Sequence, residues 1–340
     1  NGKLAVKGKA ADVDTAAKYD LTFDLDHPDL GWFLGGADEK AARRPFTLKA
    51  KVKGAPGQGG QDMDVDAVLS FAGGALKAKG KAVGVPAAPK YDLDFNADFP
   101  DTAAFLRALS PSTKAAGKLG PTKLVAKLQG DSTNVAFTGL TGNIGPANIS
   151  GEARANYAGP RAKYTVNLTS GDMPGEFFGA PAAASAPTPR GGAASGGAAA
   201  GGTLQKVEHW SREPIDLGWL LANDAEVKLQ SSSIRLGKYR VANAQVEAVL
   251  ANGALELRRF TGKLFDGNLD VKGKLVGGTA RNLETTFSLE QFDVQQAMHA
   301  LADSDRATGR ASVRGNLRGV PRTEYELIST LDGQAAIDGT

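Results

Sequence analysis

Gly2-Lys3-Leu4-Ala5-Val6-Lys7-Gly8, followed by Tyr19-Asp20-Leu21-Thr22-Phe23-Asp24-Leu25, is the stretch that decides the fold. In both runs apolar and polar residues alternate, and a period of two is typical of a strand with one apolar face. Glycine closes the first run and tyrosine opens the second. The stretch therefore predicts two strands whose apolar side chains form one face of a sheet.

The same unit recurs along the chain. It returns at 75–80 with 91–95, at 148–151 with 164–168, at 268–273 with 283–287, and at 311–315 with 325–327. Gly8, Gly80 and Gly151 stand about 72 residues apart, which indicates units of roughly four strands each. Such repetition is typical of an extended β array and argues against a compact enzyme pocket.

Short turn sequences separate the alternating runs. Asn252-Gly253, Asp266-Gly267 and Gly73-Gly74 supply residues that accept the positive φ angles of tight hairpins. Neighbouring strands are therefore expected to run antiparallel as a meander.

Three segments depart from the strand pattern, at 100–109, 215–221 and 293–301. The first and third begin with Asp near the N-cap and place apolar residues three to four apart, which predicts short amphipathic helices that cover a sheet end. The tetrapeptide at 29–32, Asp-Leu-Gly-Trp, recurs at 216–219, which favours one building plan for both halves.

The predicted fold is mainly β: an elongated, curved antiparallel sheet that forms an open groove of repeating strand units, with a few short capping helices. Its apolar face must close on itself, pack against a second sheet, or meet something hydrophobic. The residues expected to contact a hydrophobic ligand on this face are Leu4, Val6, Leu21, Phe23, Leu25, Leu93, Phe95, Val166, Leu168, Leu269, Val271, Phe287 and Leu289, and Leu48 and Val52 belong to the same face.

A run of Ala, Gly, Pro and Ser divides the chain. Residues 179–203 contain almost no side chains able to form a core and are expected to be a flexible linker or loop. Residues 1–178 are then a repeated β module that supplies one segment of the groove, and 204–340 a second β region.

Composition narrows the function. The 340 residues carry 40 basic and 37 acidic side chains, interleaved along the strands, which argues against nucleic acid as a partner. There is no cysteine, and no apolar run approaches the roughly 18 residues of a membrane span. Because the chain begins at Asn1 without Met, we expect a fragment whose targeting segment or anchor lies elsewhere.

No motif for catalysis, metal binding or cofactor binding is found. His27, His209 and His299 stand apart, and the acidic run at 62–66 lacks the glycine and closing Glu of a calcium loop, so its carboxylates are expected on one solvated strand face. Neither a G-x-S-x-G elbow nor a phosphate-binding loop occurs. We therefore predict a protein that is not an enzyme and has no cofactor, with an envelope glycan hydrolase built on two converging carboxylates as a remote alternative.

The second half carries a family resemblance. The segments on which it rests are Trp210, 214–216, 224–229, 234–237, 248–257, 262–269, 289–301 and 309–315. Together, in this order and spacing, they resemble the C-terminal region of the AsmA family, bacterial envelope proteins related to TamB and to bridge-like lipid-transfer proteins. The match covers about 204–340, and the first half shares the repeat more loosely.

The resemblance implies a non-enzymatic periplasmic protein, attached to the inner membrane through an anchor outside this sequence. It implies phospholipids as partners, moved between inner and outer membrane along the apolar β groove, in support of outer-membrane assembly and lipid homeostasis. Outer-membrane assembly proteins are further expected partners. The alternative is an envelope scaffold that assists outer-membrane protein assembly by pairing its strand edges with theirs.

Overall fold

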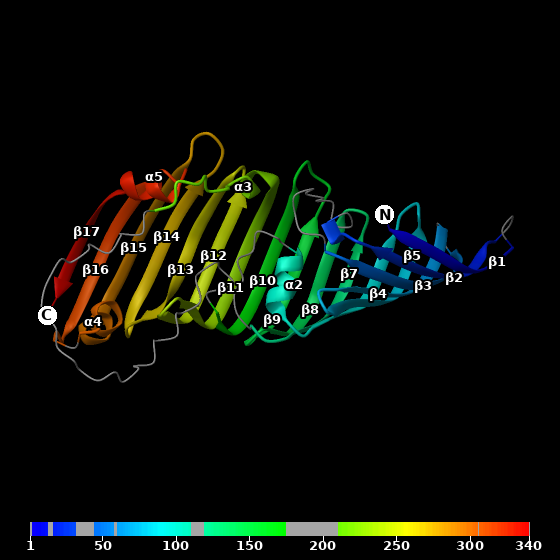
Figure 1. The fold of residues 1–340 in the computed structure, drawn as a ribbon, viewed down its shortest axis with the longest axis horizontal. Helices are drawn as coiled ribbons and strands as arrows, with labels where there is room; N and C mark the ends of the chain where they lie inside the picture. The colour runs from blue at the N-terminus through cyan, green and yellow to red at the C-terminus, as the bar shows by residue number, and fades with distance from the viewer. Residues whose placement is uncertain are drawn as a thin grey trace, which may run out of the picture.

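One long sheet makes up most of the molecule (Figure 1). The computed structural model describes residues 2–12, 16–31, 44–57, 60–109, 119–174, 210–304 and 306–339. The strands are β1 (Lys3–Ala11), β2 (Lys18–His27), β3 (Phe46–Gly57), β4 (Gly60–Phe71), β5 (Gly74–Val85), β6 (Lys90–Phe99), β7 (Thr122–Asp131), β8 (Asn134–Ile144), β9 (Ala147–Asn156), β10 (Ala162–Met173), β11 (Asn223–Leu236), β12 (Tyr239–Ala251), β13 (Ala254–Leu264), β14 (Gly267–Val276), β15 (Asn282–Asp293), β16 (Arg310–Gly319) and β17 (Asp332–Gly339). The helices are α2 (Thr102–Leu109), α3 (Trp219–Ala222), α4 (Val294–Ala302) and α5 (Glu324–Ser329).

Each strand pairs with the next one along the chain, so β1 and β17 are the two ends of the sheet. All these pairings are antiparallel except β10 with β11, which is parallel. The meander prediction is therefore wrong at this one place. The reason lies in the connection: Met173 and Asn223 are far enough apart in sequence for the chain to return to the starting end of β10, which a hairpin turn cannot do.

The predicted four-strand period is confirmed. Gly8 lies in β1, Gly80 in β5 and Gly151 in β9, so one of these glycines stands on every fourth strand of the first half. Each faces a leucine of the following strand, and a side chain at any of them would collide with that strand's backbone. The glycines therefore mark positions of close strand approach.

The predicted turns are found, two of them displaced by one residue. Asn252 and Gly253 have φ of 53° and 77°, as a type I′ turn requires. At the other two hairpins the positive φ angles belong to residues 72–73 and 265–266, because the glycine that follows already pairs as the first residue of the next strand.

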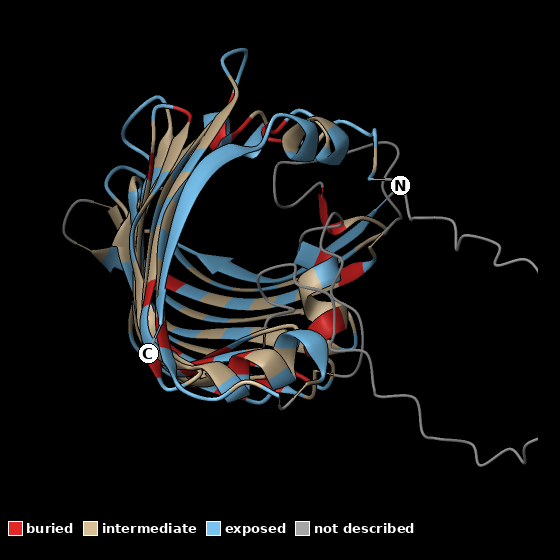
Figure 2. Ribbon diagram, turned by 90° about the vertical axis from the view of Figure 1, so that its left-hand side faces the viewer, coloured by how far each residue is buried: buried red, intermediate tan, exposed pale blue. Residues whose placement is uncertain are grey.

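The sheet is curved across its long axis (Figure 2). Helices α2 and α4 follow the ends of β6 and β15 and lie at one rim of the curve, which we call the first rim. Helices α3 and α5 lie at the opposite, second rim. The described strands form a single open sheet, so the expected open groove is confirmed and a two-sheet sandwich is wrong.

The helices expected at 100–109 and 293–301 are confirmed as α2 and α4. Asp101 accepts hydrogen bonds from the backbone N–H groups of Ala103 (2.8 Å) and Ala104 (3.2 Å), and Asp293 accepts one from Gln296 (2.9 Å). These caps explain why each helix begins where a strand ends. The other segment that departs from the strand pattern, 215–221, contributes only its last three residues to a helix, the four-residue α3.

One predicted strand is wrong. The run 325–327, Tyr-Glu-Leu, alternates like a strand but lies in α5. The Thr323 hydroxyl accepts a hydrogen bond from the backbone N–H of Glu326 at 2.9 Å, the first half of a capping box. The Thr323–Glu326 spacing favours a helix start, and an alternation of only three residues is too short to favour a strand instead.

Fully buried apolar residues gather near the rims. Under α2, Phe99 is buried between Phe71 and Phe105, with ring centroids 4.9 and 4.3 Å away. Leu220 of α3 packs on Leu217 and Leu250. A third cluster, around Ile149, Met173, Ile234 and Val241, joins the two halves near the first rim. The helices thus cover the ends of the apolar face, as predicted.

The repeated tetrapeptide forms the same local structure twice. Asp29 and Asp216 each accept a hydrogen bond from the N–H two residues later, at 3.0 and 2.8 Å. The leucine between, Leu30 or Leu217, is buried at a rim. Trp219 is described and half exposed, whereas position 32 lies outside the described residues.

Candidate functional site

One row of paired residues crosses the whole sheet, with one residue from each strand. Following the register from β1 to β17, its members are Gly8, Leu21, Val52, Val65, Gly80, Leu93, Leu128, Phe137, Ala153, Val166, Val227, Ala248, Leu257, Gly273, Thr285, Leu317 and Gly333. We call this the central row. Every member except Thr285 is apolar or glycine, so an apolar path interrupted only at Thr285 runs along the sheet.

The central row is not covered by a second layer of described residues. From Leu21 to Thr285 every member is half-buried and none is fully buried, whereas most of the fully buried apolar residues lie toward a strand end, apart from Ala126, Leu229 and Ala244. In a two-layer core the middle of each strand would be the most buried part. The apolar face is therefore shielded only by its own neighbouring side chains.

This face lies on the concave side of the sheet. The rings of Phe95 on β6 and Phe137 on β8 are 5.0 Å apart although β7 runs between them. Ala126, the β7 partner of Phe95, leaves the room that lets the two rings meet. Phe71 and Phe99 meet in the same way across β5, where Gly74 stands. Side chains from strands two apart converge here, and the rim helices pack on this side (Figure 2).

All the residues expected on the apolar face lie on it. Eleven of the thirteen are half-buried or buried, whereas Leu4 (64% exposed) and Val6 (50% exposed) are open because β1 is an edge strand. Leu48 and Val52 lie on the same face. The structure spreads these residues along the sheet and does not gather them at one point.

Sequence reasoning missed several members of the central row, among them Leu128, Phe137 and Val227. The register shifts of β8 against β7 and against β9 place one extra residue in β8 between Phe137 and Thr141, so a strict period of two assigns part of β8 to the wrong face. For Leu128 and Val227 the available signal was their apolar type within strands whose alternation is not interrupted there.

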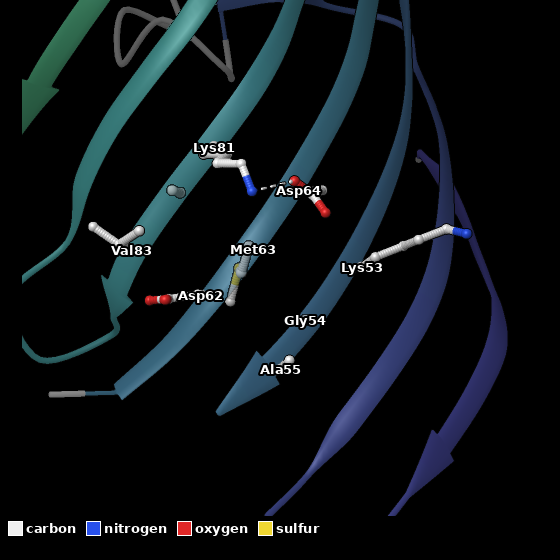
Figure 3. A pocket seen from close by; sticks show the side chains of 9 residues that line it. Lys53, Gly54, Ala55, Asp62, Met63, Asp64, Lys81 and Val83 are labelled. Carbon is white, nitrogen blue, oxygen red and sulfur yellow. Dashed lines mark ion pairs between the residues drawn. The ribbon is translucent and has the colours of Figure 1, made fainter. Parts of the chain in front are cut away.

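The convex face is charged. A second row, the polar row, begins with Lys9, Asp20, Lys53, Asp64, Lys81 and Asp92 on consecutive strands. Lys53 pairs with Asp20 at 3.1 Å and Lys81 with Asp64 at 3.4 Å. Figure 3 shows the second pair beside a shallow hollow whose lining includes Asp62 and Met63. The carboxylates at 62, 64 and 66 are exposed on one strand face, as predicted, and such exposed pairs favour register and solubility more than stability.

A polar cluster fastens the parallel junction. Asp172 accepts hydrogen bonds from the hydroxyls of Ser233 (2.7 Å) and Ser232 (3.1 Å) and from Arg240 (3.1 Å). These bonds, that of Ser233 above all, hold the pKa of the Asp172 carboxyl below its usual range. The cluster ties β10 to β11 and β12 where the chain changes from one half to the other.

The described residues contain no group of three metal-ligating side chains. His27 and His299 lie on different elements, and position 209 is outside the described residues. Asp131, whose pKa is lowered to about 2, owes the shift first to the Thr133 N–H and then to Asn134, both in its own turn between β7 and β8. The lowered pKa of Asp131 is therefore explained by hydrogen bonds within its own turn.

Comparison with known families agrees with this architecture. The model of the AsmA family matches residues 97–339, more than two thirds of the chain. The chain belongs to the AsmA family. The match begins well before residue 204, so the likeness reaches into the first half as far as β6. Neither the curated proteins nor the solved structures that were compared gave a match.

AsmA membership associates the chain with the bacterial envelope and with lipid transport or assembly there. It is not a family of known enzymes. Within the part of the chain that the structure describes, no helix is long and apolar enough to cross a membrane.

Proposed function

We propose that this AsmA chain holds or conducts phospholipid acyl chains along the concave face of its sheet, between the inner and outer membrane. The observation that carries the proposal is the central row, which offers one apolar or glycine position on every strand but β15. In this proposal the protein works in the periplasm without catalysis and supports outer-membrane assembly and lipid homeostasis.

The physical basis is the transfer of acyl chains from water to an apolar surface. Each Å² of apolar surface removed from water contributes about 25 cal/mol. The central row is half-buried, so its side chains still expose apolar surface that a bound acyl chain would remove from water. Headgroups would remain at the open side of the curve, between the two rims, where water is accessible.

The chemistry of the row also suits movement along it. Leu, Val, Ala and Gly follow one another without a charge, so an acyl chain exchanges one apolar contact for a similar one as it slides. Residues 1–178 and 204–340 then supply two segments of one groove, joined where Val166 pairs with Val227, and residues 179–203 connect them.

A second candidate is a scaffold that pairs its strand edges with outer-membrane protein strands. The observation that favours it is β17, all eight residues of which are exposed. A scaffold needs the edges alone, whereas lipid binding needs the concave face, so variants of the face separate the two.

The test is native mass spectrometry with lipid extraction on the purified chain and on two variants of β15. Phe287→Asp places a charge on the apolar face, where the ring lies over Gly315. Thr286→Asp places the same charge on the adjacent, exposed position of the opposite face. Adding Leu269→Asp to Phe287→Asp strengthens the first variant without leaving the face.

The expected result is phospholipid bound to the wild-type chain and to Thr286→Asp, and lost from the Phe287→Asp variants while their far-ultraviolet circular dichroism remains that of a β protein. A wild-type chain that binds no phospholipid, or equal binding by all variants, would contradict lipid binding on this face and shift support to the scaffold.

A further inference from the structure

One dipeptide recurs at the second rim of the first half. Lys-Tyr occurs at 18–19, 90–91 and 163–164, at the interval of about 72 residues that also separates the glycines of the four-strand period. The three pairs stand at the start of β2, β6 and β10. Strand β6 ends at the first rim, where α2 follows it, and β2 and β10 run in the same direction, because an even number of antiparallel pairings separates each from β6. All three pairs therefore lie at the second rim.

The three tyrosines lie on the concave face. Each stands two residues before a member of the central row, and side chains two residues apart in a strand share a face. The residues that flank each tyrosine on the neighbouring strands are small: Ala10 and Gly54 beside Tyr19, Ala82 and Gly130 beside Tyr91, and Ala155 and Ala225 beside Tyr164. Small neighbours leave room for each ring on the surface of the sheet.

Two of the rings lie over a glycine. A side chain at Gly54 would collide with the ring of Tyr19, and one at Gly130 would collide with the phenol end of Tyr91. The Tyr91 hydroxyl donates a hydrogen bond to the backbone carbonyl of Asn134, the first residue of β8, at 3.1 Å. The ring thus covers apolar sheet while its hydroxyl lies at the rim. Such a side chain suits a boundary between an apolar region and water.

The two rims of the first half differ in polarity. All four tyrosines of residues 1–173, the three above and Tyr157, lie at the second rim, and Tyr157 meets Tyr164 edge-on at 6.4 Å. The fully buried apolar side chains larger than alanine in β1–β10 instead lie toward the first rim: Phe46, Phe71, Phe99, Ile149 and Met173. A ligand on the concave face therefore meets an apolar wall at one rim and hydroxyl groups at the other.

The lysines add positive charge to the second rim. Lys18, Lys90 and Lys163 are exposed. Lys18 lies 3.9 Å from Asp12, with both side chains more than half exposed, whereas Lys90 and Lys163 form no ion pair within the described part of the chain. A lysine near the end of a strand extends its ammonium group into water and is able to reach an anion at the rim.

The carboxylates that face these lysines across the strands already have partners. Asp131 is opposite Lys90 but is bound by hydrogen bonds within its own turn. Asp224 is opposite Lys163 but forms an ion pair with Arg161 at 3.4 Å. Lys90 and Lys163 thus keep their charge available for an anionic group of a ligand.

We propose that a phospholipid held on the first half lies across the sheet with its phosphate at a Lys-Tyr pair of the second rim and its acyl chains toward the first rim. The lysine attracts the phosphate, and the tyrosine ring lies at the boundary between headgroup and acyl chains. The inference rests on the proposed lipid binding and adds the orientation of the lipid and the residues that set it. A further Lys-Tyr pair, at 238–239, opens β12 at the first rim of the second half and is not part of this row.

The test measures which end of a bound phospholipid lies near each rim. The chain has no cysteine, so a single introduced cysteine takes a bimane label at one known place. Ala78 and Ala82 are both half-buried residues of β5, on either side of Gly80, and pair with Phe95 and Tyr91. Labelled Ala82→Cys reports from the second-rim side and labelled Ala78→Cys from the first-rim side. The quenchers are two phosphatidylcholines, one with a nitroxide on the choline group and one with a nitroxide at the end of an acyl chain.

We expect the label at position 82 to be quenched severalfold more by the headgroup nitroxide than by the acyl-chain nitroxide, and the label at position 78 to show the reverse. Quenching at both positions without this difference, or with the opposite one, would overturn the orientation and leave lipid binding standing. No quenching of either label by either lipid would contradict lipid binding on this face and the orientation with it.

A second comparison tests the Lys-Tyr pair itself. Lys90→Gln with Tyr91→Phe, in the labelled Ala82→Cys chain, removes the charge and the hydroxyl but keeps the ring, and should abolish the preference for the headgroup nitroxide while lipid still binds. The control is Lys238→Gln with Tyr239→Phe, the same changes at the pair outside the row, which should leave the preference at position 82 unchanged. A preference that survives the first change in a folded chain, as judged by circular dichroism, would overturn the role of the pair.

Discussion

Val166 of β10 and Val227 of β11 are direct partners in the parallel pairing that joins the two halves of the sheet. They stand in the middle of the central row, with Ala153 and Ala248 on either side. Parallel pairing keeps successive partners on the same face, as antiparallel pairing does, so the change of direction does not interrupt the apolar path. One face therefore serves both halves of the chain.

A charge at this junction should divide the path. Val227→Asp puts a carboxylate in the middle of the central row, and we expect transfer of fluorescent phospholipid between two vesicle populations to fall severalfold. Lys228→Asp puts the same group on the adjacent, exposed position and should leave transfer unchanged. Equal transfer by both folded variants would show that lipid does not pass this point.

The anchoring of α3 should depend on one of two adjacent leucines. Leu220 is fully buried against Leu217 and Leu250, whereas Leu221 is 51% exposed. We expect Leu220→Ala to lower the free energy of unfolding by about 2–5 kcal/mol. Leu221→Ala should change it by less than about 0.5 kcal/mol. Urea denaturation measures both, and equal losses would contradict the packing described for α3.

The anchoring of α2 should depend on a buried hydroxyl pair. The Thr102 and Thr122 hydroxyls are 2.7 Å apart, and the Thr102 oxygen also accepts the backbone N–H of Gly145 at 3.1 Å. Thr102→Val removes the partner of the buried Thr122 hydroxyl, whereas the Gly145 N–H keeps its hydrogen bond to the Pro121 carbonyl at 3.0 Å, and the change should cost about 1–3 kcal/mol of stability. Thr102→Ser retains the hydroxyl and should recover most of the loss in the same denaturation experiment; a Thr102→Val variant as stable as the wild type would contradict a stabilising role for the hydroxyl pair.

The turn between β7 and β8 should carry a pH dependence. Hydrogen bonds, first from the Thr133 N–H and then from Asn134, lower the pKa of Asp131 from 3.8 to about 2. Because the folded pKa lies below the unfolded one, the stabilisation is fully present above the unfolded value and is lost as pH falls from there through about 2. A carboxyl-detected NMR titration should give a midpoint near 2, whereas a midpoint near 3.8 would exclude these hydrogen bonds in solution.

Much of the fold follows from a period of two. The alternation in β2, β6, β14 and β15 predicts strands and assigns the correct residues to one face, since a strand has only two faces. The parallel junction could not be predicted, because the long connection from Met173 to Asn223 carries no sequence signal for direction. Helix α5 was missed because the prediction followed three alternating residues and did not use the capping pair Thr323 and Glu326.

The sequence predicts which residues share the apolar face, but not how the curved sheet brings side chains of different strands into contact. Alternation placed Leu93, Phe95 and Val166 together, but the curvature that brings Phe95 to Phe137 depends on the small Ala126 between them, which is a relation across three strands. At 125–127 and 137–140 the pairing register of one strand shifts against its neighbour. The sequence of a single strand does not reveal such shifts.

The most direct test of the continuous apolar face is photo-crosslinking to phospholipid from four positions. A benzophenone side chain replaces Leu93 or Leu257, which lie on the central row in different halves, or their neighbours Asp94 and Glu256 on the convex face. We expect phospholipid adducts from Leu93 and Leu257 and none from Asp94 or Glu256. Adducts from only one half, or equal adducts from both faces, would contradict a single lipid-holding face that spans the chain.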